Sequence, residues 1–216
     1  MRPSSTLCAE KSSSNTYNPF DVGLTDLLGF SSGYRAMMNC DLLFMIGTDF
    51  PYQQFYPKGR DGRSARYRGE QLGRRTKIDY GYVGDTQTTL KALLPRVQQN
   101  SNSDHLRDCV EHYRKTRKEL DDLATPSREG QPLHPQHVVR LLSELAADDA
   151  IFSCDVGTPT IWSARYLTMN GKRRLLGSFN HGSMANALPQ AIGAQVSHPG
   201  RQVVALSGDG GLAMLM

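Results

Sequence analysis

The stretch Val203-Val204-Ala205-Leu206-Ser207-Gly208-Asp209-Gly210-Gly211 decides the fold class of this chain. Its apolar half has the length of a buried strand, and the glycine-rich turn leads into an apolar segment that we expect to start a helix. In open α/β sheets, ligands bind beyond the carboxyl ends of the strands. Glycines at that edge let backbone amides approach a phosphate, and the following helix N-terminus attracts the same negative charge. The turn is therefore predicted to hold a diphosphate.

Asp209 is the charged residue of this turn. A carboxylate beside a diphosphate is repelled unless a cation lies between them, and Mg²⁺ is commonly held by one or two carboxylates together with phosphate oxygens. Asp209 is therefore a candidate Mg²⁺ ligand. The alternative is a tight turn in which the aspartate caps the next helix. The position of the turn, after one strand and before one helix, favours the ligand interpretation.

A second glycine-rich loop, 177–187 (GSFNHGSMANA), also follows an expected strand and leads into a helix. Parallel strands place such loops at one edge of the sheet. His181 in this loop is a candidate catalytic residue, although a surface histidine is the more common explanation. Met184 is by type more often a core residue than a cofactor contact.

The rest of the chain alternates between strand and helix patterns. Strands are expected at 41–47, 150–154, 174–177 and 202–207, and helices at 33–39, 86–98, 104–123, 138–145, 159–167 and 185–196. This alternation predicts an α/β fold of parallel sheets with helices on both faces, arranged as two Rossmann-like domains that are each incomplete.

Composition suggests the boundaries of these domains. Residues 1–17 are rich in Ser, Thr and Asn and are expected to be disordered. Residues 18–123 form the first predicted domain, 124–134 (ATPSREGQPLH) a linker, and 135–216 the first part of a second domain that is expected to be cut short.

A basic run between residues 58 and 77 carries eight Lys or Arg residues and two acidic ones. We expect a solvated loop there. Nucleic-acid binding is not expected, because no nucleic-acid-binding fold signature accompanies the charge.

The remaining composition points to a cytoplasmic protein. No apolar run is long enough to cross a membrane, and the N-terminus lacks the apolar segment of a signal peptide. The four cysteines are widely spaced without a CxxC pair, which predicts reduced thiols and argues against a zinc site.

Two stretches resemble one known family. Residues 154–195 (CDVGTPTIWSARYLTMNGKRRLLGSFNHGSMANALPQAIGAQ) closely resemble the quinone-linked bacterial pyruvate oxidases, which depend on thiamine diphosphate. Residues 18–57 (NPFDVGLTDLLGFSSGYRAMMNCDLLFMIGTDFPYQQFYP) resemble the flavin-binding middle domain of the same enzymes, and residues 79–123 continue that match.

The resemblance implies a set of site residues. Thiamine diphosphate contacts fall on Gly182, Ser183 and Met184, with the methionine wedging the cofactor into a bent form. Contacts to Mg²⁺ and diphosphate fall on Asp209, Gly210 and Gly211, with Asp209 as the metal ligand. FAD contacts fall on Thr25, Asp26, Leu27, Leu28, Thr48, Asp49, Phe50, Pro51 and Tyr52. Asp26 departs from the glycine usual in the family, and its carboxylate would repel a flavin diphosphate.

The implied reaction is the oxidative decarboxylation of pyruvate to acetate and CO₂, with electrons passing through FAD to a quinone. The cofactor supplies the electron sink, and no side chain of this chain is assigned as a catalytic acid or base. The resemblance also implies a homotetramer that lies peripherally on the inner membrane. We expect the family's N-terminal domain with its activating glutamate, a second Mg²⁺ ligand and the membrane-binding tail to be absent here.

Two alternatives stay open. One is a non-redox relative, of the acetolactate synthase or decarboxylase type. The other is an inactive remnant, suggested because residues 1–16 and 58–67 do not match the family and have the aperiodic composition of a misread reading frame.

Overall fold

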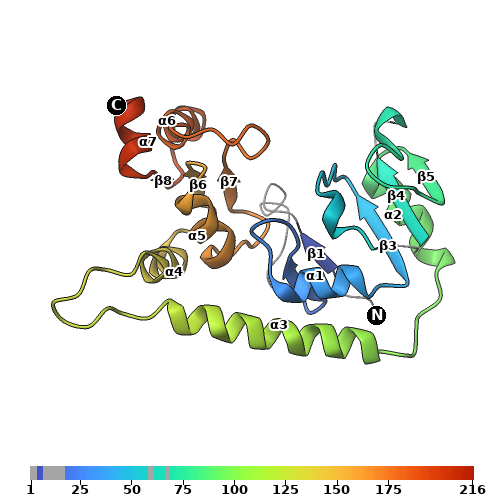
Figure 1. The fold of residues 1–216 in the computed structure, drawn as a ribbon. Coiled ribbons are helices and arrows are strands. Elements are labelled where there is room, and N and C mark those ends of the chain that lie inside the picture. Colours follow the sequence, from blue (N-terminus) through green and yellow to red (C-terminus); the bar gives the residue numbers. More distant parts are fainter. Residues whose placement is uncertain (1–3, 7–17, 58–60, 67–68) are drawn as a thin grey trace. The chain divides into compact units, whose positions relative to one another are not determined.

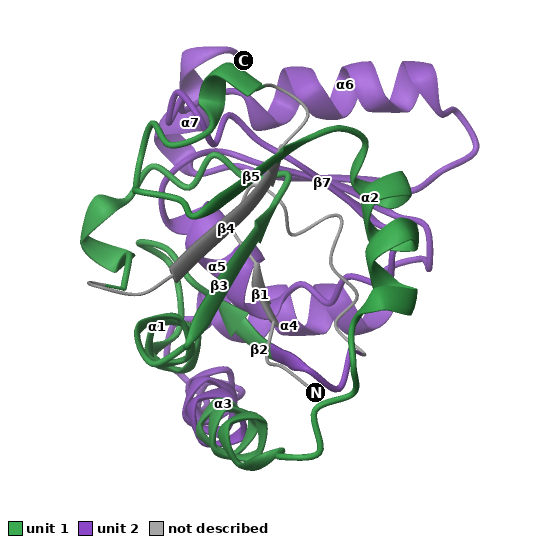
Figure 2. Cartoon of the chain, turned by 90° about the vertical axis from the view of Figure 1, so that its right-hand side faces the viewer, with its two compact units in different colours: residues 1–5, 22–113 green, residues 6–21, 114–216 purple. Residues whose placement is uncertain are grey.

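A computed structural model describes residues 4–6, 18–57, 61–66 and 69–216 (Figure 1). The chain forms two compact units: unit 1 is Met1–Ser5 with Val22–Tyr113, and unit 2 is Thr6–Asp21 with Arg114–Met216 (Figure 2). Among the described residues, no helix is both long and apolar enough to cross a membrane.

Unit 1 contains a parallel sheet in the order β3-β4-β5, and strands β1 and β2 form a separate two-stranded sheet. The strands are β1 (Ser4–Thr6), β2 (Asp21–Leu24), β3 (Leu42–Ile46), β4 (Asp61–Arg66) and β5 (Tyr80–Val83). The helices are α1 (Ser31–Met38) and α2 (Thr86–Leu93), with short 3-10 turns η2 (Gln53–Phe55), η3 (Gly69–Gln71) and η4 (Leu94–Arg96). The expected strand at 41–47 and the expected helices at 33–39 and 86–98 are present, with ends shifted by a few residues.

Strand β4 corrects the prediction of a solvated loop in the basic run. It pairs in parallel with β3 on one side, Leu42 opposite Asp61, and with β5 on the other, Arg63 opposite Tyr80. A ladder of this kind is made by backbone N–H and C=O groups, so a strand with neighbours on both sides needs no apolar pattern of its own. Residues 58–60 and 67–68 of the same run lie outside the described residues.

Strand β1 likewise differs from the expectation that residues 1–17 are disordered. Ser4–Thr6 pairs with β2 in a two-stranded sheet. The partner strand β2 lies outside residues 1–17, so the composition of residues 1–17 did not indicate the pairing. The other residues of that stretch lie outside the described residues.

A small core joins α1 to the first half of helix α3 (Asp104–Leu123) in unit 1. Val22, Ala36 and Cys109 are buried, and Val110 and Tyr113 pack against them. Phe30 stacks on Tyr113 with ring centroids 5.9 Å apart.

Unit 2 holds a second parallel sheet, in the order β7-β6-β8. Its strands are β6 (Ile151–Cys154), β7 (Arg174–Leu176) and β8 (Val203–Leu206), and its helices are α4 (Pro135–Leu145), α5 (Thr158–Tyr166), α6 (Ala187–Ser197) and α7 (Asp209–Met214). Every strand and helix expected beyond residue 135 is found. The α/β class with parallel sheets is confirmed.

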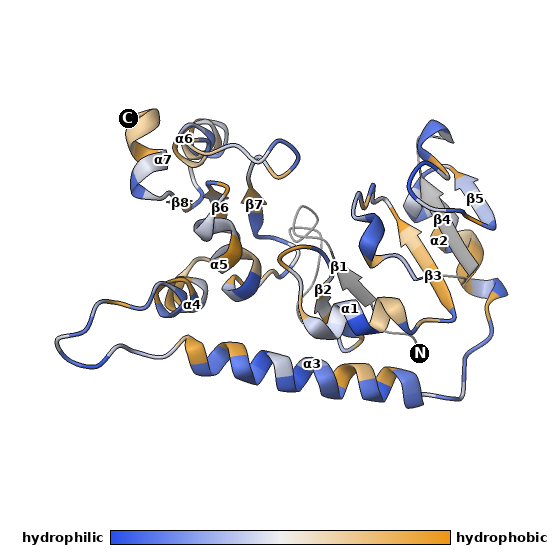
Figure 3. Ribbon diagram, in the orientation of Figure 1, coloured by the Kyte–Doolittle hydropathy of each residue, from blue (hydrophilic) through white to orange (hydrophobic). Residues whose placement is uncertain are grey.

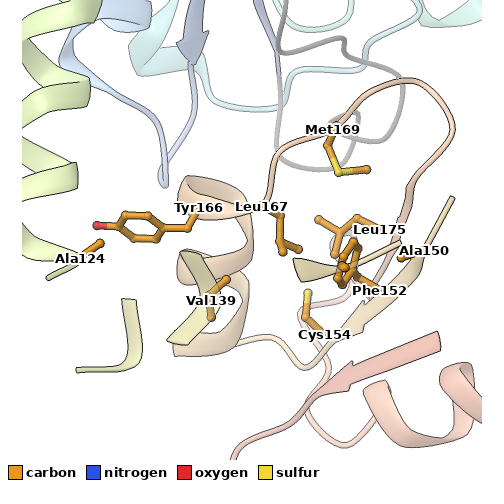
Figure 4. Packing of buried hydrophobic residues seen from close by; sticks show 10 residues of the cluster. Ala124, Val139, Ala150, Phe152, Cys154, Tyr166, Leu167, Met169 and Leu175 are labelled. Carbon is orange, nitrogen blue, oxygen red and sulfur yellow. The ribbon is translucent and has the colours of Figure 1, made fainter. Parts of the chain in front are cut away.

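The core of unit 2 is built around β6, whose four residues are all buried. Phe152, Leu167 and Met169 are nearly inaccessible to solvent and form one cluster with Leu175 (Figure 4). Fully burying side chains of this size stabilises a fold by roughly 1.5–3 kcal/mol each. This cluster fixes the strand whose carboxyl end carries the candidate site.

The two compact units divide inside α3 rather than at the predicted linker 124–134. The second half of α3 packs in unit 2, where the Tyr166 hydroxyl donates to the Leu120 carbonyl at 2.9 Å. Much of the α3 ribbon is hydrophilic, with apolar residues at intervals along it (Figure 3). Residues 124–134 connect α3 to α4 without helix or strand. The predicted domain boundaries themselves stay a prediction.

Candidate cofactor site

Three loops meet at the carboxyl edge of the sheet in unit 2. They follow Cys154 at the end of β6, Leu176 at the end of β7 and Leu206 at the end of β8. Because these strands are parallel and hydrogen-bonded to one another, their carboxyl ends lie side by side. Both predicted cofactor loops, 177–187 and 207–211, belong to this edge.

The turn after β8 starts helix α7 at Asp209, with Gly208 as its N-cap residue. The Leu212 amide donates to the Gly208 carbonyl at 2.8 Å, which closes the first helical turn. The alternative in which Asp209 is the helix cap is therefore wrong. Asp209 is exposed in the first turn of α7, where its carboxylate is accessible to a cation.

The glycines of this turn differ in the space around them. Apart from its chain neighbours, no described residue has a heavy atom within 4 Å of where a Cβ at Gly208 would be. At Gly210, outside the helix backbone, the described residue that comes this close is Met184, whose Cε would lie 3.6 Å from the Cβ. The backbone at these two positions is therefore open to a ligand on the side that a side chain would fill.

The loop after β7 brings Met184 to the same place. Gly182 has φ +68° and its amide donates to the Ser178 carbonyl at 2.7 Å, while the Ser178 and Ser183 hydroxyls lie 3.0 Å apart. Met184 is half exposed, with its methyl group against Gly210. Gly182–Met184 and Asp209–Gly211, predicted separately, are thus brought together.

Ala185 holds a strained conformation beside Met184. Its φ of 62° is left-handed, a region in which a residue with a Cβ is disfavoured by roughly 1–2 kcal/mol. Such strain persists only where the surroundings impose it, and it gathers at ligand sites. His181 is exposed in the same loop, and we assign it no catalytic role.

Asp155 is a site residue that the sequence analysis missed. It follows β6 directly and is 2% exposed. Its Oδ1 accepts from the Ala187 amide at 2.8 Å, and its Oδ2 accepts from the Ser207 hydroxyl. An aspartate placed immediately after an apolar strand was the available signal, because that position lies at the ligand edge of a parallel sheet.

The turn after β8 offers a metal ion the carboxylate of Asp209. Among the residues that the structure describes, no group of three or more His, Cys, Asp or Glu side chains could hold an ion. Asp209 is a single exposed carboxylate. This arrangement suits Mg²⁺ that is shared between one carboxylate, water and ligand phosphate oxygens.

The predicted FAD contacts fall on two turns of unit 1, after β2 and after β3. In the first, Thr25 and Asp26 are buried and Leu27 is 64% exposed. The Leu28 amide donates to Asp26 Oδ1 at 2.7 Å. This carboxylate therefore stabilises its own turn, which gives it a structural role at the position where glycine is usual.

The second turn is partly a core element. Phe50 is 3% exposed and packs edge-to-face on Tyr52, Phe55 and Tyr56. Pro51 and Asp49 are exposed, and Thr48 Oγ accepts from the Phe50 amide at 3.3 Å. The two turns belong to different sheets and are linked by the contact of α1 with η2, where the Tyr34 and Phe55 rings lie 5.6 Å apart.

Comparison with known families matches both units. Residues 3–93 match the central domain of thiamine pyrophosphate enzymes, and residues 155–216 match their C-terminal domain, which binds thiamine pyrophosphate. The first match includes residues 3–16 and 58–67, which were expected not to match the family. The chain belongs to the thiamine pyrophosphate enzymes. The open turn 208–210 and the Met184 loop both lie within residues 155–216, the part of this chain that matches the cofactor-binding domain of the family.

Individual relatives carry different names. The chain is 36% identical over 199 residues to the putative thiamine pyrophosphate-containing protein YdaP of Bacillus subtilis, covering 92% of this chain and 34% of the relative. It is 28% identical over 204 residues to a pyruvate oxidase of Lactiplantibacillus plantarum (92% and 33%). It is 30% identical over 218 residues to the acetolactate synthase large subunit of Parasynechococcus marenigrum (98% and 34%). The chain thus spans about a third of the length of these relatives, and their names do not separate an oxidase from a synthase.

Proposed function

We propose that this chain serves a thiamine-diphosphate- and FAD-dependent enzyme that oxidatively decarboxylates pyruvate to acetate and CO₂ and passes the electrons to a quinone. The observation that carries the cofactor part is the meeting of two loops at one sheet edge, with the Met184 methyl group against Gly210. The oxidative part rests on the resemblance of residues 154–195 and 18–57 to quinone-linked pyruvate oxidases.

The residues of unit 2 suit a magnesium-bound diphosphate. Asp209 offers an exposed carboxylate, and the backbone at Gly208 and Gly210 is open beside it. A cation held by Asp209 would remove the repulsion between this carboxylate and the diphosphate. Met184 would pack against the cofactor from the opposite loop.

Bound thiamine diphosphate supplies an electron sink for the decarboxylation of a 2-oxo acid. The contribution of this chain is to bind and orient the cofactor. We assign no proton transfer to its side chains. By the same resemblance we propose a homotetramer that acts in the cytoplasm at the inner membrane.

A non-redox synthase is the second candidate. It is favoured by the acetolactate synthase relative, whose 30% identity is no lower than the 28% of the pyruvate oxidase. The two candidates share the thiamine site and differ in whether pyruvate reduces the flavin.

Calorimetric titration of the purified chain tests the shared site. We expect thiamine diphosphate to bind only when Mg²⁺ is present, and Asp209→Asn to weaken this binding roughly tenfold or more, because it removes the protein's charged ligand to the ion. Asp122→Asn is the matched control, since Asp122 is an exposed carboxylate on α3 that pairs with Lys118. Wild-type binding that needs no Mg²⁺, or that Asp209→Asn leaves intact, would contradict the assigned site.

A second measurement separates the two reactions. The chain is loaded with thiamine diphosphate, Mg²⁺ and FAD, and pyruvate is added without oxygen. Loss of the oxidised flavin absorbance, with acetate formed, supports the oxidase. Acetolactate formed while the flavin stays oxidised supports the synthase, and no turnover of pyruvate by the loaded chain supports the inactive remnant.

A further inference from the structure

The carboxyl group of Asp155 joins three elements at the candidate site. It lies at the end of β6, its Oδ1 accepts from the first amide of α6, and its Oδ2 accepts from Ser207 at the end of β8. The Asp155 amide also donates to the Leu206 carbonyl at 3.0 Å. A buried carboxyl group is tolerated only when it is well hydrogen-bonded, so these contacts fix the side chain in one position.

The Asp155 carboxyl group lies so close to Gly211 that residue 211 has no room for a side chain. A Cβ at Gly211 would lie 2.1 Å from Asp155 Oδ2 and 3.2 Å from the Ser207 Oγ. The residue is buried, and its φ is not left-handed. The absence of a side chain is therefore a steric need. In this turn a Cβ would meet open space at Gly208 and would make an ordinary contact with Met184 at Gly210, whereas at Gly211 it would overlap the protein's own carboxyl group.

The next residue in the chain reaches the second cofactor loop. The Val156 amide donates to the Ser183 carbonyl at 3.2 Å. The end of β6 therefore contacts the Met184 loop through Val156 and the Asp209 turn through Asp155. Asp209 itself lies two residues beyond Ser207, on a six-residue helix, so its position depends on how that turn is anchored.

We propose that Asp155 is a positioning residue for the magnesium-diphosphate turn, acting through Ser207 and the space at Gly211 without touching the cofactor. This inference rests on the proposed thiamine site. Its physical basis is that a ligand group binds a metal well only when its own support is fixed, and loss of a supporting hydrogen bond commonly costs about 10-fold to 100-fold in metal affinity.

The test is a double-mutant cycle on Mg²⁺-dependent binding of thiamine diphosphate, measured by calorimetry on the full chain. Ser207→Ala removes one hydroxyl and is the mild variant, and Asp155→Asn is the second. Ser197→Ala is the matched control, because Ser197 on α6 also donates one hydrogen bond, to the Gly193 carbonyl at 2.8 Å. The fluorescence of Trp162, the single tryptophan, reports whether each variant is folded.

We expect Ser207→Ala to weaken binding about tenfold in the wild-type background and to have little effect when Asp209 is already Asn. Such coupling is not produced by general destabilisation, which would act equally in both backgrounds. Ser197→Ala is expected to bind as the wild type does.

Two results would overturn the positioning role alone: a folded Ser207→Ala or Asp155→Asn chain that binds like the wild type, or equal losses with and without the Asp209 carboxylate. Absence of Mg²⁺-dependent binding in the wild-type chain would instead refute the proposed function, and the positioning role with it. The wild-type titration therefore distinguishes the two failures.

Discussion

The Arg173 guanidinium donates to the Ala146 carbonyl at 2.6 Å, at the end of helix α4. The same group donates to the carbonyls of Ser143, Ala147 and Thr168. Arg173 is 7% exposed and lies over the Phe152 ring at 5.9 Å. A cation at a helix C-terminus satisfies carbonyls that lack partners within the helix and interacts favourably with the helix dipole.

Arg173→Met is expected to destabilise unit 2 by about 2–4 kcal/mol, because it leaves several buried carbonyls without a donor. Urea unfolding followed by Trp162 fluorescence measures the change. Arg174→Met is the control, since this neighbouring side chain is exposed and donates to carbonyls of its own turn. A loss no larger for Arg173 than for Arg174 would show that this cap contributes nothing specific.

Two glycine substitutions in unit 2 are expected to have opposite effects. Gly211→Ala should destabilise by roughly 1–3 kcal/mol, because the new methyl group overlaps the Asp155 carboxyl group. Gly193→Ala lies in helix α6, where the added Cβ would have no described heavy atom within 4 Å outside the backbone of its own helix, and it should stabilise by about 0.5–1 kcal/mol. Thermal unfolding of the two variants checks both signs, and a tolerated Gly211→Ala would argue against the observed Asp155 position.

The stability of unit 2 is expected to fall in alkaline solution. Burial raises the pKa of the Cys154 thiol above its usual value of 9.0. Above pH 9.0 the unfolded chain therefore loses this proton while the native chain keeps it. Below that pH the Cys154 thiol does not reduce the free energy of unfolding. As the pH rises from there toward the native pKa of the thiol, the free energy of unfolding falls by up to about 1.4 kcal/mol per pH unit.

Denaturant unfolding between pH 7 and pH 10 on wild-type and Cys154→Ala chains tests this expectation. The variant should be less stable at pH 7, because it opens a cavity in the core, but its stability should fall less steeply with pH. Ser153→Ala, in the same buried strand, lacks a titrating group and controls for a change in packing. Equal pH slopes for Cys154→Ala and the wild type would contradict the prediction.

Strand β4 is expected to be sensitive to proline despite its polar composition. Ser64 pairs with Met45 of β3 on one side and with Gly81 of β5 on the other. Ser64→Pro removes a donor and distorts the centre of the sheet, which a central strand does not tolerate. Hydrogen exchange of the β3 and β5 amides should speed up in this variant. Ser101→Pro, in an exposed loop, should leave exchange unchanged, and protection retained in Ser64→Pro would place β4 outside the sheet.

Local patterns were sufficient to predict most of unit 2. The apolar runs at 150–154 and 202–207, the helix spacing at 138–145 and the glycine-rich turn at 208–211 are each patterns of a few consecutive residues. Hydrophobic periodicity and glycine placement are local properties of a chain, so they identified the strands, the helices and the ligand edge of the sheet.

Contacts between distant residues were decided only by the folded structure. Strand β4 is held by partners on both sides that its own composition does not indicate. Asp155 meets Ser207 across 52 positions of the chain, and this meeting, rather than any left-handed backbone, is the reason for glycine at 211. A sequence shows which backbone shapes a segment prefers, whereas the space left beside each residue depends on the side chains that folding brings against it.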